Sequence, residues 1–276
     1  MKKETLYNKK SREILQAELQ QESFERITCS FYRYTKIENP DTLRNDLYRE
    51  WDALKVFGRI YLAKEGINAQ FSCPEQHWEQ FKANLASHEI LKDMLLKIAV
   101  QDGESFYKLT IKIKDEIVAY GVGEDEYDMA QIGNHLSAEE FNKKLNEDNT
   151  VIVDMRNYYE SEVGRFKDAI VPDVDTSREL LPKVRSLLKG HEKDEVLLYC
   201  TGGIRCEKAS AYLINHGFKH VNQLKGGIIQ YAHDVKAQGL DSKFVGKNFV
   251  FDARMGERVT DDVLGVCHQC GDPADH

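Results

Sequence analysis

A short apolar run that ends in a cysteine, a glycine pair and a new helix constrains this chain more than any other feature. Residues 196–199 (Val-Leu-Leu-Tyr) predict a buried strand. Cys200 follows directly, and Gly202 and Gly203 then allow a tight turn with backbone amides facing inward. A helix is expected from about Arg205. The cysteine is therefore predicted at the carboxyl end of a strand and in front of a helix N-terminus.

The predicted position of Cys200 favours a thiolate. Unpaired amides and the helix dipole stabilise negative charge there, which lowers the pKa of a thiol and makes it a usable nucleophile. The alternative is a small core cysteine that ends a strand. The glycine turn and Arg205 favour the reactive interpretation. We therefore expect Cys200 to be catalytic, within an active-site loop of Thr201, Gly202, Gly203, Ile204 and Arg205.

Residues 136–240 alternate strand and helix patterns around this stretch. Ser137-Ala-Glu-Glu140 is a capping box that begins a helix, and Val151 to Asp154 predicts a buried strand. Such alternation predicts a parallel sheet with helices on both faces, and these folds place their sites at the carboxyl edge of the strands. Three polar residues follow the first strand at that edge and are expected to support Cys200 without performing chemistry, namely Asp154, Arg156 and Glu160. A buried carboxylate there would pair with an arginine, and Arg205 is a candidate.

The first half of the chain has a different pattern. From Arg26 the order of predicted elements is strand, helix, strand, strand, helix, strand, which indicates a ferredoxin-like α+β domain over residues 26–113, with room for an extra strand. The two helices begin near Pro40 and Pro74, and the last two strands are expected over 95–100 and 107–113.

Three segments flank these two domains. Residues 1–25 are expected to form an N-terminal helical extension, and the acidic, glycine-containing residues 114–135 a linker. Residues 241–276 are a less regular tail whose abrupt end suggests truncation. It carries a Cys-x2-Cys knuckle, Cys267 and Cys270, which is half of a structural zinc site. His268 and His276 are nearby, but no second cysteine pair follows. An exposed tail with two unpaired thiols and a metal site are about equally compatible with this spacing, and bound zinc is not predicted.

Composition limits the class of protein. The chain of 276 residues is long enough for about two domains. No apolar run approaches membrane-spanning length, and six cysteines without regular spacing suggest a reducing compartment, so a cytoplasmic protein is expected. The net charge of −8 argues against a protein that coats nucleic acid, yet residues 1–110 balance 17 basic against 17 acidic residues.

The motifs around Cys200 resemble a rhodanese domain. Residues 199–206 (Tyr-Cys-Thr-Gly-Gly-Ile-Arg-Cys), 216–221 and 224–228 (Leu-Lys-Gly-Gly-Ile) resemble its active-site half, and 151–170 its first half. One departure is Gly-Arg-Phe at 164–166, where Gly-His-Ile is usual. Another is Cys206, where serine is commoner. Cys206 is interpreted equally as a resolving thiol or a buried packing residue.

The two-domain arrangement resembles the bacterial tRNA uridine hydroxylase family of rhodanese-related proteins. Residues 58–68 (Gly-Arg-Ile-Tyr-Leu-Ala-Lys-Glu-Gly-Ile-Asn), the Cys200 motif and 249–254 (Phe-Val-Phe-Asp-Ala-Arg) carry the resemblance. It implies an acylphosphatase-like first domain and oxygen-dependent hydroxylation of carbon 5 of the wobble uridine. Molecular oxygen is the implied co-substrate. Hydroxylation usually needs a flavin or a metal, and the sequence shows no flavin, nicotinamide or metal signature.

Three other functions are compatible with parts of the sequence. Plain sulfur transfer through a Cys200 persulfide is the main alternative. A phosphate site of the Cys-x5-Arg type is disfavoured, because only four residues separate Cys200 from Arg205. A non-catalytic binding module is disfavoured by the intact cysteine and glycine turn.

The implied tRNA partner requires a basic surface. The first domain offers Arg33, Lys36, Arg59 and Lys64 as candidates for binding the anticodon loop. Three tyrosines interleave with them and could stack on unpaired bases, namely Tyr32, Tyr34 and Tyr61. An ordinary solvated sheet face with half-buried tyrosines is the alternative.

Overall fold

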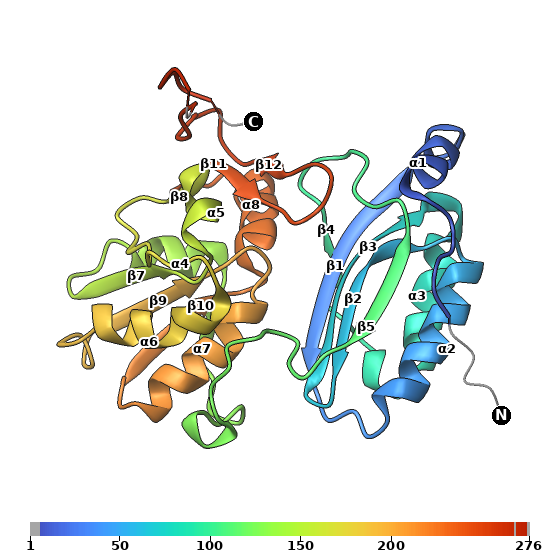
Figure 1. Ribbon diagram of the computed structural model, residues 1–276. Helices are drawn as coiled ribbons and strands as arrows, with labels where there is room; N and C mark the ends of the chain where they lie inside the picture. Colours follow the sequence, from blue (N-terminus) through green and yellow to red (C-terminus); the bar gives the residue numbers. More distant parts are fainter. Residues whose placement is uncertain (1–5, 268, 275–276) are drawn as a thin grey trace. The chain divides into compact units, whose positions relative to one another are not determined.

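The computed structural model describes residues 6–267 and 269–274, which fold into two compact units (Figure 1). One unit runs to Ile117 and includes Asp252–Arg254, and the other begins at Val118 and holds the remaining residues. No helix in the described ranges is both long enough and apolar enough to cross a membrane.

The first unit is built on a five-stranded sheet of order β4-β1-β3-β2-β5. Its elements are α1 (Arg12–Gln20), β1 (Arg26–Tyr34), α2 (Pro40–Ala53), β2 (Phe57–Ala63), β3 (Gly66–Pro74), α3 (Trp78–Ser87), β4 (Lys97–Ile98) and β5 (Leu109–Ile113), with 3₁₀ turns η1 (Glu75–His77) and η2 (Glu89–Leu91). Strands β1, β2, β3 and β4 pair antiparallel, and β5 adds to β2 in parallel. This is the ferredoxin-like order predicted from the sequence, extended by one strand. The predicted strand over 95–100 is shorter than expected, at two residues.

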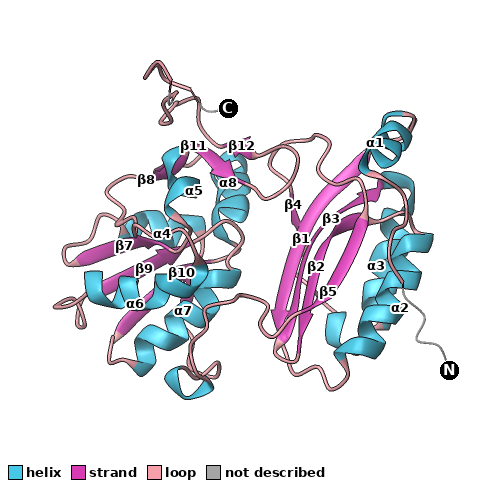
Figure 2. Ribbon diagram, in the orientation of Figure 1, coloured by secondary structure: helices cyan, strands magenta, loops and turns pink. Residues whose placement is uncertain are grey.

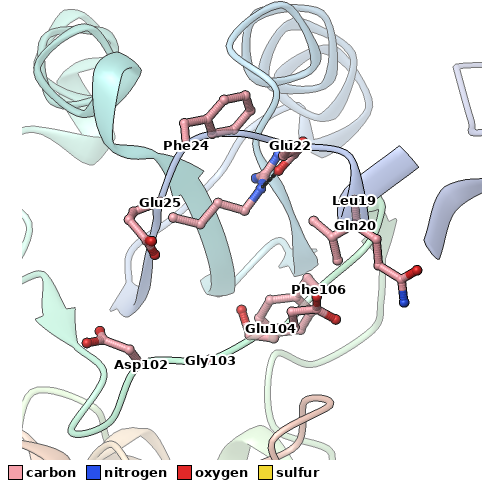
Figure 3. A pocket seen from close by; sticks show the side chains of 11 residues that line it. Leu19, Gln20, Glu22, Phe24, Glu25, Asp102, Gly103, Glu104 and Phe106 are labelled. Carbon is pink, nitrogen blue, oxygen red and sulfur yellow. Dashed lines mark hydrogen bonds and ion pairs between the residues drawn. The ribbon is translucent and has the colours of Figure 1, made fainter. Parts of the chain in front are cut away.

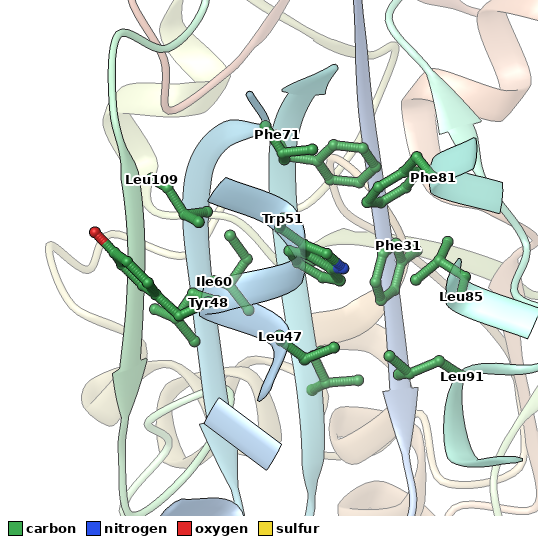
Figure 4. Close-up of a cluster of buried hydrophobic side chains, with 14 of the residues drawn as sticks. Phe31, Leu47, Tyr48, Trp51, Ile60, Phe71, Phe81, Leu85, Leu91 and Leu109 are labelled. Carbon is green, nitrogen blue, oxygen red and sulfur yellow. The ribbon is translucent and has the colours of Figure 1, made fainter. Parts of the chain in front are cut away.

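The core of this unit lies between the sheet and helices α2 and α3, which cover one face (Figure 2). Alternation along each strand sends every second side chain to that face, where Phe31 and Phe71 meet Trp51 and Phe81 (Figure 4). Helix α2 begins where Asn39 caps it through the amide of Thr42. The opposite face of the sheet carries the alternate side chains, which include Arg59, Tyr61 and Lys112.

The second unit is built on a four-stranded parallel sheet of order β6-β10-β9-β7. Its elements are η3 (Glu124–Glu126), β6 (Asn134–Leu136), α4 (Ala138–Lys144), β7 (Thr150–Asp154), α5 (Tyr158–Glu162), β8 (Gly164–Phe166), α6 (Ser177–Leu187), β9 (Glu195–Tyr199), α7 (Ile204–Asn215), β10 (His220–Leu224), α8 (Gly227–Gln238), β11 (Phe244–Phe249) and β12 (Gly256–Arg258). Strands β8, β11 and β12 form a separate small sheet.

Helices cover both faces of the parallel sheet, and strand alternation divides the core in two. Val196, Leu198 and Cys200 pack on one face with buried side chains of α6 and α7. Leu197 and Tyr199 pack on the other face with buried side chains of α4 and α8. Each face thus receives a full apolar layer, which explains the continuous apolar run before Cys200.

Two segments expected to be irregular contribute to this unit. Val118 and Tyr120, within the segment interpreted as a linker, are buried in the α6 and α7 side of the core. The tail provides β11, which pairs with β8 from Phe244 to Gly246. Both segments do carry apolar residues, at 117–122 and 244–251, but the acidic residues and glycines around them led to their interpretation as irregular.

Candidate active site

Cys200 lies where the sequence predicts it, directly after β9 and before α7. Gly203 has a φ of 96°, a left-handed conformation that glycine adopts without strain, and caps the start of α7. Its amide donates to the Cys200 Sγ at 3.1 Å. The Cys200 side chain is fully buried. The turn therefore aims a backbone donor at the sulfur.

The pKa of Cys200 reflects several opposing effects. Burial alone raises the pKa of a thiol, because the thiolate loses its water. The Cys206 thiol as a hydrogen-bond donor, the Arg205 charge, and the amides of Arg205 and Gly203 outweigh burial and lower the pKa of Cys200 to about 6. At neutral pH this sulfur is a thiolate. The loop can thus activate a nucleophile or carry a sulfur-bound intermediate.

Cys206 remains protonated beside it. Burial, and then its hydrogen bond to Cys200, raise the pKa of Cys206 well above the ordinary thiol value. Its side chain is fully buried in the same core layer as Cys200. Cys206 is thus both a packing residue and a donor to the neighbouring sulfur.

A buried ion pair fixes the loop. Arg205 donates from Nη1 and Nη2 to the two Glu160 carboxylate oxygens at 2.6 and 2.9 Å. Arg205 Nη2 also donates to Thr201 Oγ1 at 3.1 Å. The Glu160 carboxylate in turn accepts the amide of Asn157 at 2.9 Å, within a capping box at the start of α5. The pairing of Glu160 with Arg205 considered from the sequence is therefore present.

Asp154 and Arg156 form a second buried pair, on the other side of the sheet. The Asp154 carboxylate accepts from Arg156 Nε and Nη2, from Ser161 Oγ and from the Tyr199 hydroxyl. Burial alone would raise the pKa of Asp154, but Arg156 and these donors lower it. Arg156 also donates to the Gly164 carbonyl at 2.7 Å. Through Tyr199 this pair holds the strand that precedes Cys200.

Helix α8 contributes to the site in a way that the sequence did not reveal. The amides of Ile228 and Ile229 donate to the Cys200 and Thr201 carbonyls at 3.0 and 3.1 Å. Gly227 has a φ of 69°, and a Cβ there would lie 2.5 Å from the Cys200 carbonyl oxygen. The glycine pair at 226–227 was visible in the sequence, but its partner was not. The absence of a side chain at Gly227 therefore lets the start of α8 approach the Cys200 loop closely enough to bind its carbonyls.

Tyr120 is a further residue missed from the sequence. Its hydroxyl donates to the Arg205 carbonyl at 3.0 Å, and its side chain is 1% exposed. It belongs to the acidic segment interpreted as a linker, although Val118, Tyr120 and Val122 alternate there and could have indicated a short buried stretch. Tyr120 ties this segment to the start of α7.

Potential metal ligands do not gather in the described part of the chain. Across residues 6–267 and 269–274, no group of three or more His, Cys, Asp or Glu side chains could hold a metal ion. Cys267 and Cys270 are described, whereas His268 and His276 lie outside the described residues.

The four proposed RNA-binding residues do not share one surface. Strand alternation places Arg33 on the helix-covered face, where its guanidinium donates to the Ile90 and Asp93 carbonyls. The expectation that Arg33 lies with Tyr32 and Tyr34 was therefore wrong, because neighbouring residues of a strand point to opposite faces. Arg59 does lie on the open face. Lys36 is exposed and pairs with Glu38 at 2.7 Å, and Lys64 is exposed at the turn between β2 and β3.

Two further lysines join the open face. Lys97 is buried, and its Nζ lies 4.4 Å from the centroid of the Tyr32 ring, which packs against Tyr34 at 6.5 Å. Lys112 is exposed and stands opposite Tyr61 in the pairing of β2 with β5. The open face thus combines cations with aromatic rings.

A pocket of about 280 Å³ in the first unit has the opposite character (Figure 3). Its charged lining residues are four carboxylates and one arginine, namely Glu22, Glu25, Asp102, Glu104 and Arg26. Arg26 is already paired with Glu22 at 2.6 Å. A negatively charged lining disfavours phosphate, so this pocket is not a site for RNA backbone.

The fold and the cysteine loop together define a rhodanese-like domain preceded by an acylphosphatase-like domain. Residues 26–117 match the family described as UPF0176 acylphosphatase like domain, 137–234 match the rhodanese-like domain, and 245–276 match the rhodanase C-terminal family.

Full-length relatives are similar over nearly the whole chain. The chain is 54% identical over 275 residues to the tRNA uridine(34) hydroxylase of Leptospira interrogans, covering 99% of the chain and 75% of that protein. It is 49% identical over 272 residues to the tRNA uridine(34) hydroxylase of Yersinia pestis (strain Pestoides F), covering 98% and 77%. The chain therefore belongs to the tRNA uridine(34) hydroxylase family, which confirms the resemblance noted from its motifs.

Proposed function

We propose that this chain hydroxylates the wobble uridine of tRNA at carbon 5, with dioxygen as co-substrate and Cys200 as the catalytic residue. The names of its relatives support the reaction. The single observation in this chain that carries the proposal is the buried sulfur of Cys200, which receives a backbone N–H and has a pKa of about 6. Such a thiolate suits a cysteine-bound intermediate, including a persulfide.

Mass analysis of tRNA nucleosides tests this function. Wild-type protein and unmodified tRNA should give 5-hydroxyuridine under air. Under isotopically labelled dioxygen, the product should carry the label. Cys200→Ser should give none while its thermal midpoint stays nearly unchanged. Equal product under nitrogen, or full activity of Cys200→Ser, would contradict the proposal.

Sulfur transfer is a second candidate, favoured by the short loop. Only four residues separate Cys200 from Arg205, and the loop amides converge on a single sulfur atom. This geometry suits a small transferred atom rather than a phosphate group. Thiosulfate and cyanide should then yield thiocyanate and sulfite. Thiocyanate formation without any oxygen-dependent tRNA product would favour this candidate.

We propose that the open face of the first unit is the surface that binds the anticodon loop. Arg59 and Lys112 supply exposed positive charge there, and Lys36 and Lys64 add it at exposed turns. Three tyrosines supply rings on which unpaired bases can stack, namely Tyr32, Tyr34 and Tyr61. A wobble base in a single-stranded loop needs no extrusion from a duplex before it reaches Cys200.

The salt dependence of tRNA affinity tests this binding surface. Removal of one lysine or arginine that binds a phosphate should reduce the slope of log affinity against log salt by about one unit. Arg59→Ala with Lys64→Ala in the full chain should weaken tRNA binding and flatten that slope. Arg49→Ala with Lys82→Ala removes the same charge from helices α2 and α3 and should have little effect. Wild-type affinity of the first double variant at low salt would exclude the open face.

A further inference from the structure

Two aromatic rings border the Cys200 loop in the second unit. Tyr159 on α5 and Phe249 at the end of β11 meet edge to face, with ring centroids 5.6 Å apart and an interplanar angle of 78°. Both side chains are only partly buried, and neither belongs to the hydrophobic clusters that form the cores of this unit. The pair is therefore an aromatic surface beside the site rather than part of the core.

Hydrogen bonds tie both residues to the catalytic loop. The Phe249 carbonyl accepts from Thr201 Oγ1 at 3.4 Å, and Thr201 Oγ1 accepts from Arg205 at 3.1 Å. On the other side, the Tyr159 hydroxyl accepts from Asn157 Nδ2 at 2.9 Å.

Glu160 closes the connection. It binds Arg205 through two hydrogen bonds and accepts the amide of Asn157. A continuous chain of hydrogen bonds therefore connects Phe249 to Tyr159 by way of the Cys200 loop. The contact between the two rings joins the ends of this chain. These contacts fix the positions of the two rings relative to Thr201.

We propose that Tyr159 and Phe249 hold the uracil base beside Cys200 by stacking. The proposal rests on the proposed tRNA function. A nucleobase is a neutral, planar ring, and two partly exposed, uncharged aromatic side chains are complementary to it. Phosphate recognition would instead need cations, and the guanidinium among these contacts, Arg205, is already paired with Glu160. Tyr159 and Phe249 are thus base-binding residues, and the Glu160–Arg205 ion pair positions the loop beside them.

The contribution of the base itself can be measured with two RNAs. A fluorescent anticodon stem–loop with uridine at the wobble position is compared with the same RNA that is abasic there, both binding to the full chain. One stacked base is expected to make the uridine RNA bind about 5- to 150-fold more tightly to the wild type. In Tyr159→Leu with Phe249→Leu this ratio should fall to near one, while affinity for the abasic RNA stays unchanged. Tyr159→Phe keeps the ring and should keep most of the ratio.

Tyr158→Leu is the matched control. Tyr158 lies on the same helix and is 38% exposed, and of the two proposed residues its ring contacts only Tyr159, at 6.3 Å. The ratio should be nearly wild type in this variant. Thermal midpoints check folding, and the two single leucine variants replace the double variant if it is unfolded.

The outcomes separate this inference from the proposed function. Equal binding of both RNAs by a wild type that does hydroxylate tRNA overturns this inference alone. A full ratio in the Tyr159 and Phe249 variants, or an equal loss in Tyr158→Leu, also overturns it. No binding of either RNA together with no 5-hydroxyuridine overturns the proposed function, and this inference with it.

Discussion

Two buried carboxylate–arginine pairs begin within ten residues of one another at the end of β7, yet they have different partners. Asp154–Arg156 is completely buried, at 0% exposure of both side chains, and it binds Tyr199 and Ser161. Glu160–Arg205 leaves Arg205 slightly exposed and binds Thr201 in the loop that follows Cys200. Strand alternation makes the difference, because Tyr199 and Cys200 point to opposite faces of the sheet. The first pair therefore serves stability, and the second positions the loop.

Breaking the first pair should have the largest effect on stability. Asp154→Ala leaves the Arg156 guanidinium buried without its carboxylate, and the free energy of unfolding should fall by about 3–5 kcal/mol. Urea unfolding monitored by circular dichroism measures this loss. Glu162→Ala, which removes an exposed carboxylate from α5, is the control and should cost little. A loss below about 1 kcal/mol in Asp154→Ala would contradict a structural role.

The second pair can be tested by a double-mutant cycle. Glu160→Gln and Arg205→Met, singly and together, should show a coupling of about 0.5–3 kcal/mol in the free energy of unfolding. Turnover should fall in both single variants, because each releases Thr201 and the start of α7. Strictly additive losses would show that the ion pair does not act as a unit.

Removing the Cys206 thiol should shift the pH dependence of activity. Cys206→Ala removes a donor to the Cys200 sulfur, so the pKa of Cys200 should rise from about 6. Since the thiolate is lost as pH falls, activity should decrease most at the acidic end, and each unit of rise lowers the thiolate fraction there about tenfold. Cys206→Ser retains a donor and should shift less. Superimposable pH profiles of all three proteins would exclude the hydrogen bond.

Peptide mapping shows whether Cys206 only lowers the pKa of Cys200 or also takes part in redox chemistry. If Cys206 resolves an oxidised Cys200, mildly oxidised wild type should contain a Cys200–Cys206 disulfide. If Cys206 only tunes and packs, that species is absent and Cys206→Ser remains active.

Much of the site could be predicted because its signal is local. The apolar run, Cys200 and the glycine turn lie within a dozen residues. Together they predict a strand, a tight turn and a helix in immediate succession. Tyr120 and Phe249 were missed because each reaches the loop from a distant segment that was interpreted as irregular. Tyr120 lies in the supposed linker and Phe249 in the tail. The Ile228 amide was hidden for another reason, because a backbone donor leaves no mark in the sequence.

The error at Arg33 has a different origin. Grouping Tyr32, Arg33 and Tyr34 by their nearness in sequence ignored the period of two that the same strand shows in its core residues. Helix α2 and the Glu160–Arg205 pair could be predicted, each for its own reason. Asn39 before Pro40 is a local cap, and a carboxylate at the edge of a parallel sheet has few arginines within reach.

Direct titration of Cys200 tests the central claim, that the loop holds a reactive thiolate at neutral pH. Thiolate absorbance is followed across pH in wild type and in Cys200→Ser, and the difference isolates this one sulfur. We expect an apparent pKa of about 6, because the donors around Cys200 outweigh its burial. A pKa at or above the ordinary cysteine value of about 8.5 would contradict the account, since Cys200 would then be a protonated core residue.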